Sequence, residues 1–301
     1  MHNNDDLTLK ASALTILICI LFGANPVAIK LSLTGLGAFT AAGIRFTIAA
    51  VVIFIWAKIK KIPLKLNQKQ LGQMVIVAAI FVVQLSCFYI GLDKTTASHG
   101  ALISNVLPFI VLVLAHFFIP GDTISFKKGI GITLGFTGVV FLFFDAQDMS
   151  ADFRKGDFII LLVMFLWGSS TIYVKRIIDQ YNVIQITIYP MIFGIPFFFL
   201  GGFLWDDQMI HMINSTVIKA LLYQAIVTAS FGFLAWNSLL QKFGATALHS
   251  FIFIIPLAGV LFGVLFLKDT ITPHLITSIV FIVTGVIIVN LRRKKKPASA
   301  Q

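Results

Sequence analysis

Ten apolar segments divide the sequence, each close to the ~20 residues that an α-helix needs to cross a lipid bilayer. Backbone groups inside a bilayer must be hydrogen-bonded within the protein, and a helix achieves this within one segment. Only 12% of the residues are charged and 58% are hydrophobic, whereas a soluble domain carries about 25% charged residues. The chain is therefore predicted to be an all-α integral membrane protein, with the lipid bilayer as its surroundings. The expected spans are 11–31, 37–57, 70–92, 95–118, 127–145, 157–178, 182–204, 218–241, 245–267 and 271–291.

One stretch from the middle of the chain is repeated near its end. The segment 122–139 begins Asp-Thr-Ile-Ser and ends Thr-Gly-Val, and the segment 269–286 begins Asp-Thr-Ile-Thr and ends in the same three residues. Because the copies lie about half a chain apart, the sequence is interpreted as two five-helix repeats, 1–147 and 148–301. Five is an odd number of spans, so the second repeat must be inverted across the membrane relative to the first. The polar loop 145–157 is the expected linker.

Lys and Arg are unevenly divided between the two ends of the spans. With the N-terminus in the cytoplasm, sixteen of them lie at cytoplasmic ends and six at outer ends, and Arg45 lies inside a span. Both termini are predicted to be cytoplasmic, since cytoplasmic loops are enriched in Lys and Arg. This orientation also accounts for the net charge of +11 without nucleic acid as a partner.

Short motifs occupy matching places in the two halves. Phe22-Gly23 in the first span corresponds to Trp167-Gly168 in the sixth, and the second span contains Ala-Gly-Ile-Arg-Phe at 42–46. Together with the repeated Asp-Thr-Ile and Thr-Gly-Val motifs, they make nearly the whole chain resemble the EamA-type branch of the drug/metabolite transporter (DMT) superfamily. Family members usually have Gly-Glu before the last span of each half, whereas this chain has Gly-Asp at 121–122 and Lys-Asp at 268–269.

The resemblance implies a multi-pass carrier of the inner cell membrane, often an exporter of amino acids or related small metabolites. It also implies a central cavity formed by spans 1–4 and 6–9, with spans 5 and 10 supporting the two halves from outside. Inverted repeats are typical of secondary transporters, because two similar halves of opposite orientation can open a midplane site to either side in turn. Alternating access is therefore expected, and the alternative is a multi-span receptor, sensor or channel without carrier activity.

Several polar and aromatic side chains are predicted at membrane depth and are candidates for lining the cavity. Polar amides in membrane helices also commonly bridge neighbouring helices, and that interpretation stays open for each of them. A cavity with this mixture of groups would suit a small zwitterion or an aromatic solute. The candidates are Asn25, Gln84, Tyr89, Asn105, Trp167, Ser169, Ser170, Tyr173, Trp236, Asn237 and Phe253.

Three titratable or charged residues are candidates for gating or coupling. Arg45 cannot lose its charge in the second span; it would bind an anion, pair with an outside carboxylate as a gate, or reach outward to carbonyls as a structural residue. His99 and His249 hold similar places in the two copies, and histidine changes charge near neutral pH. No acidic residue is expected at mid-membrane, so proton coupling through histidine and facilitated diffusion both fit the sequence.

Other functions receive no support from the sequence. There is no Glu for a His-Glu-x-x-His motif and no Gly-x-Ser-x-Gly, so we expect no enzyme, no metal site and no cofactor. Cys19 and Cys87 lie in apolar runs and are interpreted as small buried hydrophobes. Glycines four residues apart in the fifth and ninth spans predict close helix packing within the bundle, or a dimer contact. A monomer and a homodimer both remain open.

Overall fold

The computed structural model describes residues 8–119, 124–145, 150–243 and 251–290, and its regular elements within these ranges are helices. A single β-bridge between Leu36 and Ile210 is the exception. Eight of the described helices are long and apolar enough to cross a membrane, and two further apolar helices are shorter. The prediction of an all-α membrane protein with ten spans is therefore confirmed, while the two inverted repeats stay a prediction.

Six of the spans are single helices, and four consist of consecutive helical pieces. The single helices are α1 (Leu9–Leu33), α2 (Ala38–Ile59), α3 (Gln68–Lys94), α6 (Phe126–Asp145), α8 (Val183–Trp205) and α13 (Pro273–Asn290). The composite spans are α4 (Ala97–Ser104) with α5 (Leu107–Phe118), α7 (Ala151–Ile177) with the 3₁₀-helix η2 (Ile178–Gln180), α9 (Ser215–Leu222) with the π-helix η3 (Tyr223–Gly232) and α10 (Phe233–Phe243), and α12 (Ile254–Phe262) with the π-helix η4 (Gly263–Leu267).

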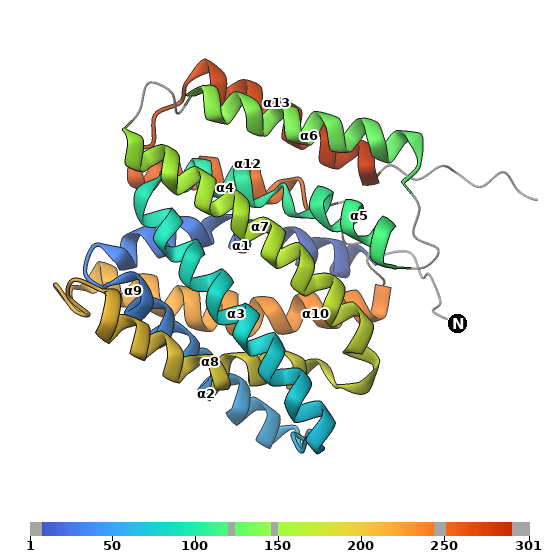
Figure 1. Cartoon of the computed structure of the whole chain (residues 1–301), viewed down its shortest axis with the longest axis vertical. Coiled ribbons are helices and arrows are strands. Elements are labelled where there is room, and N and C mark those ends of the chain that lie inside the picture. The colour runs from blue at the N-terminus through green and yellow to red at the C-terminus, as the bar shows by residue number, and fades with distance from the viewer. Residues whose placement is uncertain (1–7, 120–123, 146–149, 244–250, 291–301) are drawn as a thin grey trace, which may run out of the picture.

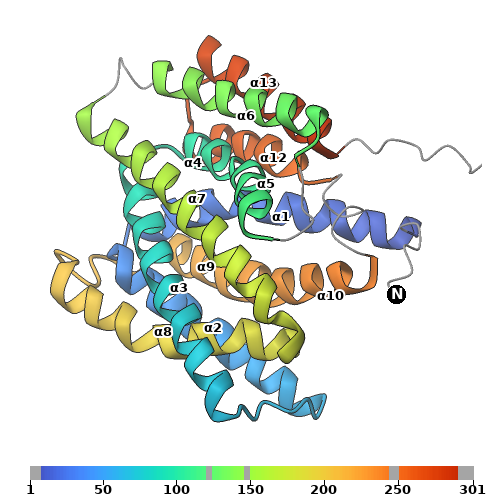
Figure 2. The same cartoon turned by 45° about the vertical axis from the view of Figure 1, so that its right-hand side comes forward.

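The helices form a layered bundle in which α6 and α13 lie side by side along one edge (Figures 1 and 2). The pair α2 and α8 lies at the opposite edge, and α1, α4, α7 and α12 lie between the two pairs. We call the side on which α1 begins and α2 ends the N-terminal face. The side on which α1 ends and α2 begins is the far face.

Glycines bring the backbones of α6 and α13 into direct contact. A Cβ added at Gly131 would lie 2.7 Å from the carbonyl oxygen of Gly285, and one added at Gly138 would lie 2.9 Å from the carbonyl oxygen of Ser278. Real Cβ atoms do not approach backbone oxygens this closely, so only glycine permits the spacing. Small residues that let helix backbones approach are typical of membrane helix pairs.

Two aspartates from distant parts of the chain cap helices on the far face. Asp206 accepts hydrogen bonds from the backbone N–H groups of Phe39 (3.2 Å) and Thr40 (2.9 Å) at the start of α2. The N-cap residue of α2 is Gly37, which has no side chain to do this. Asp269 similarly accepts from the backbone N–H (2.8 Å) and the hydroxyl (2.7 Å) of Ser98 in α4. A negative charge at a helix N-terminus also interacts favourably with the helix dipole.

We expect Asp206→Ala to lower the free energy of unfolding by about 1–2 kcal/mol, because it removes the acceptor for the first N–H groups of α2. Thermal or denaturant unfolding of the purified protein in detergent would measure the change. Asp207→Ala is the matched control, since Asp207 is exposed and its removal should change stability by less than about 0.5 kcal/mol. Equal effects of the two substitutions would contradict the capping role.

The predicted linker 145–157 is shorter than expected, because α7 begins at Ala151. Ser150 caps this helix by accepting a hydrogen bond from the N–H of Phe153 (3.2 Å), and Asp152 lies in its first turn. Polar residues that cap and begin a helix resemble a loop in the sequence, which explains the error. As a consequence, Asp157 lies in the second turn of α7 and is 0% exposed.

The fourth span is interrupted at Asn105 and Val106, between α4 and α5. Pro108 lies in the first turn of α5, where its missing N–H leaves no helical hydrogen bond broken. Asn105 turns its side chain back to donate to the carbonyl oxygen of Ala101 (2.7 Å). The interruption therefore places a polar side chain and a helix end in the middle of the bundle.

Candidate functional site

A cavity of about 580 Å³ lies between the spans that flank the centre of the bundle. Its lining extends from Ala101 and Arg45, towards the far face, to Ile178 and Val183 at the turn between α7 and α8 on the N-terminal face. No lining residue comes from the described parts of α6 and α13. Most of the wall is apolar, and the polar side chains in it are Asn25, Arg45, Gln84, Ser104, Asn105, Ser170, Thr171, Thr187 and Thr228.

The structure places some of the expected cavity residues in this lining and others elsewhere. Those in the lining are Asn25, Gln84, Asn105, Trp167, Ser170, Trp236 and Arg45. Ser169 is instead exposed on the outer side of α7, and its hydroxyl donates to the carbonyl oxygen of Phe165 (2.8 Å). Tyr173 packs against a separate apolar cluster that contains Met74. The side chain of Asn237 and the whole of His249 lie outside the described residues.

Two more expected lining residues belong to the main apolar core and are not part of the cavity lining. Phe253 immediately precedes α12 and packs against the main apolar core. Tyr89 is fully buried, and its hydroxyl accepts a hydrogen bond from Arg45, but it is not part of the lining. Both positions follow from tertiary packing, which the spacing of residues within one helix does not reveal.

Arg45 is a cation in the lining of this cavity, and the described residues that contact its guanidinium group are neutral. It is 3% exposed, and its two terminal nitrogens donate to the hydroxyls of Tyr89 (3.2 Å) and Thr228 (3.3 Å). Its guanidinium carbon lies 5.0 Å from the ring centroid of Phe46, within the range of a cation–π contact. The Nε atom has no hydrogen-bond partner, and no described carboxylate forms an ion pair with the side chain.

A chain of hydrogen bonds connects the two hydroxyls that hold Arg45 to the first and eighth spans. The hydroxyl of Tyr89 donates to Oε1 of Gln224 (2.6 Å), and the amide nitrogen of Gln224 donates to the carbonyl oxygen of Ala28 (2.9 Å). The hydroxyl of Thr228 lies 3.0 Å from Oδ1 of Asn25. Gln224 and Thr228 were not among the sequence candidates, although an amide and a hydroxyl four residues apart on one face of an apolar span are a recognisable signal.

Gln84 contributes a second polar group without a partner to the cavity. It is 4% exposed, and its carbonyl oxygen accepts no hydrogen bond from the described residues. The only other such side-chain oxygen found in the described part of the chain belongs to Ser86, which does not line the cavity. A buried amide without a partner is costly, which makes this position notable.

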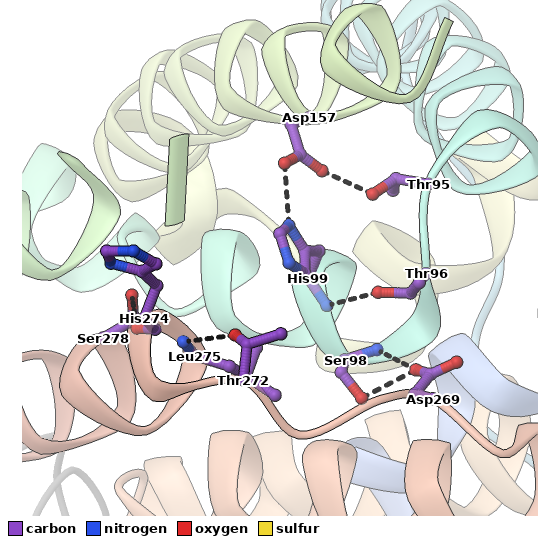
Figure 3. A network of polar contacts seen from close by, with 10 residues as sticks. All are labelled: Thr95, Thr96, Ser98, His99, Asp157, Asp269, Thr272, His274, Leu275 and Ser278. Atoms are coloured by element: carbon purple, nitrogen blue, oxygen red, sulfur yellow. Dashed lines mark hydrogen bonds and ion pairs between the residues drawn. The ribbon is translucent and has the colours of Figure 1, made fainter. Parts of the chain in front are cut away.

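On the far face, a buried network joins α4 to α7 and to the segment before α13 (Figure 3). Nδ1 of His99 lies 2.8 Å from Oδ2 of Asp157, and the hydroxyl of Thr95 donates to the other carboxylate oxygen (2.5 Å). The imidazole is 3% exposed and the carboxylate 0%. The sequence places Asp157 at the end of a polar loop, so its burial beside His99 in the second turn of α7 is a correction. The bond between Asp269 and Ser98 extends the network.

Comparison with known proteins gives a consistent picture. A model of the EamA-like transporter family matches residues 9–144 and again 154–291. A probable amino-acid metabolite efflux pump of Escherichia coli is 26% identical over 93% of this chain and 94% of its own length. An uncharacterized transporter of Bacillus subtilis, YvbV, is 25% identical over 97% of this chain and 95% of its own length. A solved crystal structure with 13% identity superposes with a TM-score of 0.69 over 94% of this chain and 98% of its own, which shows the fold alone.

Proposed function

Because the chain belongs to the EamA-like transporter family, we propose that it is a secondary carrier that exports amino acids or related small metabolites by alternating access around the central cavity. The observation that carries the proposal is the cavity itself, which lies between the spans, is mainly apolar and is provided with a few polar groups. Such a composition is typical of sites for small organic molecules. The substrate class is supported by the name of the Escherichia coli relative.

The two separate matches to the family model, 9–144 and 154–291, support two repeats of one unit. The excess of Lys and Arg supports cytoplasmic termini in the inner cell membrane, with the N-terminal face inside. The cavity lining then reaches the cytoplasmic side at Ile178 and Val183. Side-chain bonds of Asp157, Asp206 and Asp269 hold the outer side together. Side-chain bonds also join the helices on the cytoplasmic side, for example from the side-chain nitrogen of Gln185 to the carbonyl oxygen of Lys65, so alternating access would require each side to open in turn.

Solute counterflow in proteoliposomes tests the carrier function. Vesicles preloaded with one unlabelled amino acid should accumulate the same labelled amino acid transiently, and protein-free vesicles should not. Movement that never saturates and shows no counterflow would favour a channel. Binding of amino acids to the protein without any movement would favour a receptor and would contradict the carrier proposal.

Proton coupling is part of the proposal and depends on the pair formed by His99 and Asp157. The pair joins α4 to α7 on the far face, so opening that face would separate or rearrange the two side chains. Because histidine changes charge near neutral pH, the strength of this contact would then depend on pH. Other titratable groups on the elements packed around His99 include Lys30, Asp93, Lys94, Asp269 and His274, and the first turns of α7 add Asp152, Arg154 and Lys155.

We expect His99→Gln to flatten the dependence of transport on pH between about pH 5 and pH 8, because glutamine can still donate to Asp157 but does not titrate. Counterflow measured at a series of external pH values would show this. His274→Gln is the control, since His274 is exposed near the same network, and it should keep the wild-type profile. An unchanged profile for His99→Gln would rule out coupling through this pair.

A further inference from the structure

We propose that Arg45 and Gln84 recognise the two charged ends of an amino acid in the cavity, with Arg45 binding the carboxylate and the carbonyl oxygen of Gln84 accepting from the ammonium group. The proposal rests on the transport function proposed above and adds the residues that select the substrate. Both side chains line the same cavity, and each carries a buried atom that has no partner among the described residues.

The first argument is the uncompensated charge of Arg45. A buried cation is costly unless an anion is paired with it, and a guanidinium cannot escape the cost by losing its proton. Two neutral hydroxyls and the ring of Phe46 are the contacts that the described residues provide. An anion that enters the cavity would supply the missing charge, so the surroundings of Arg45 are complementary to a carboxylate.

The second argument is that the far-face carboxylates that are not exposed to the surroundings are engaged elsewhere. On the far face Asp206 caps α2, Asp269 binds Ser98, and Asp157 is held by His99 and Thr95. None of these three carboxylates pairs with the guanidinium group of Arg45, so the carboxylate of a ligand can bind it. Its Nε–H and a terminal N–H share one edge, and that edge suits the two oxygens of a carboxylate.

The third argument is the opposite polarity of the two atoms without partners. The Nε of Arg45 is a donor, whereas the Oε1 of Gln84 is an acceptor. A simple acid would use only the first of them, and a simple amine only the second, while a zwitterion uses both. The apolar and aromatic wall, including Phe81, Phe88 and Trp167, would then hold the side chain of the amino acid.

Thermal stabilisation of the detergent-purified full chain by each of the standard amino acids tests the proposal without requiring transport. The best ligand is then compared with its amide, which has no carboxylate, and with its deaminated acid, which has no ammonium group. We expect both analogues to bind at least about tenfold more weakly than the amino acid. Equal binding of the amide, or no stabilisation by any amino acid, would overturn the proposal.

Variants then assign the two ends of the substrate. Arg45→Gln should abolish the preference for the acid over the amide, and Arg45→Lys should retain part of it because the charge remains. Gln84→Met should abolish the preference for the amino acid over the deaminated acid only. Ser86→Ala is the matched control, since it removes a buried hydroxyl without a partner that lies outside the cavity, and it should leave both preferences unchanged.

The stability of the ligand-free variants separates binding from a structural role. Since Arg45 is an uncompensated buried charge, Arg45→Gln should unfold at the wild-type temperature or above it. A lower unfolding temperature that Arg45→Lys restores would show that Arg45 is structural and would overturn the proposal. If the amino acid binds with the expected preferences but proteoliposomes show no counterflow, the carrier function fails and the assignment of Arg45 and Gln84 stands.

Discussion

Asp157→Ala is expected to lower the free energy of unfolding by about 3–5 kcal/mol, the range found when one partner of a buried ion pair is removed. The substitution deprives both His99 and Thr95 of the carboxylate that they contact inside the bundle. Both groups are buried there, so water cannot replace the lost partner without rearrangement. Denaturant titration of the purified protein in detergent micelles would measure the loss.

Two further variants make this prediction specific. Asp152→Ala, five residues earlier in the same helix, removes an exposed ion pair with Lys155 in which both side chains are 68% exposed, and such a change should stay within about 0.5 kcal/mol. Asp157→Asn keeps a group of the same shape that can accept from Thr95 and should recover most of the stability. A loss for Asp157→Ala as small as that for Asp152→Ala would contradict a structural role of the pair.

Gly131→Ala is expected to lower the free energy of unfolding by about 1–3 kcal/mol, as overpacking of a close contact does. The added methyl group would lie 2.7 Å from the carbonyl oxygen of Gly285 and 2.6 Å from the side chain of Val289. A side chain can turn away, but the backbone oxygen of α13 can move only if the whole helix shifts. Thermal unfolding in detergent would show the loss.

Gly129→Ala, two residues earlier in α6, should have the opposite effect. A Cβ at Gly129 meets no atom within 4 Å, and alanine favours a helix over glycine by about 0.5–1 kcal/mol. The pair of variants therefore separates helix propensity from the contact with α13. If both substitutions stabilised the protein, the close approach of the two backbones would not be a feature of the folded state.

The sequence predicted the spans because a run of about twenty apolar residues in a membrane forms a helix, which satisfies its backbone hydrogen bonds within the segment. It was less informative about which face of a span is turned inward. Ser169 and Ser170 are adjacent and chemically identical, yet only Ser170 lines the cavity, since successive helical residues point about 100° apart. Because the neighbouring spans decide which direction is inward, the choice required the tertiary structure.

Polar residues at the ends of spans were the hardest to place from the sequence. Asp157 follows a run of charged and small residues that is typical of a loop, but Ser150 starts a helix ahead of it. The acid thereby becomes buried next to His99, a neighbour 58 residues earlier in the chain. Pairings over such separations depend on how α4 meets α7, and no local spacing encodes them.

The π-helix η3 gives the eighth span a property that a regular helix would lack. Its hydroxyl at Ser230 bonds to the carbonyl oxygen of Ala225, five residues earlier, in keeping with the wider turn. If the whole segment changed to α-helical hydrogen bonding, α10 would turn about the span axis and move along it relative to α9, because π-helical hydrogen bonds reach one residue further than α-helical ones and so wind the chain differently. Phe233 and Trp236, which line the cavity, would turn together with α10. The eighth span thus contains a segment whose change in helical winding would reshape the cavity.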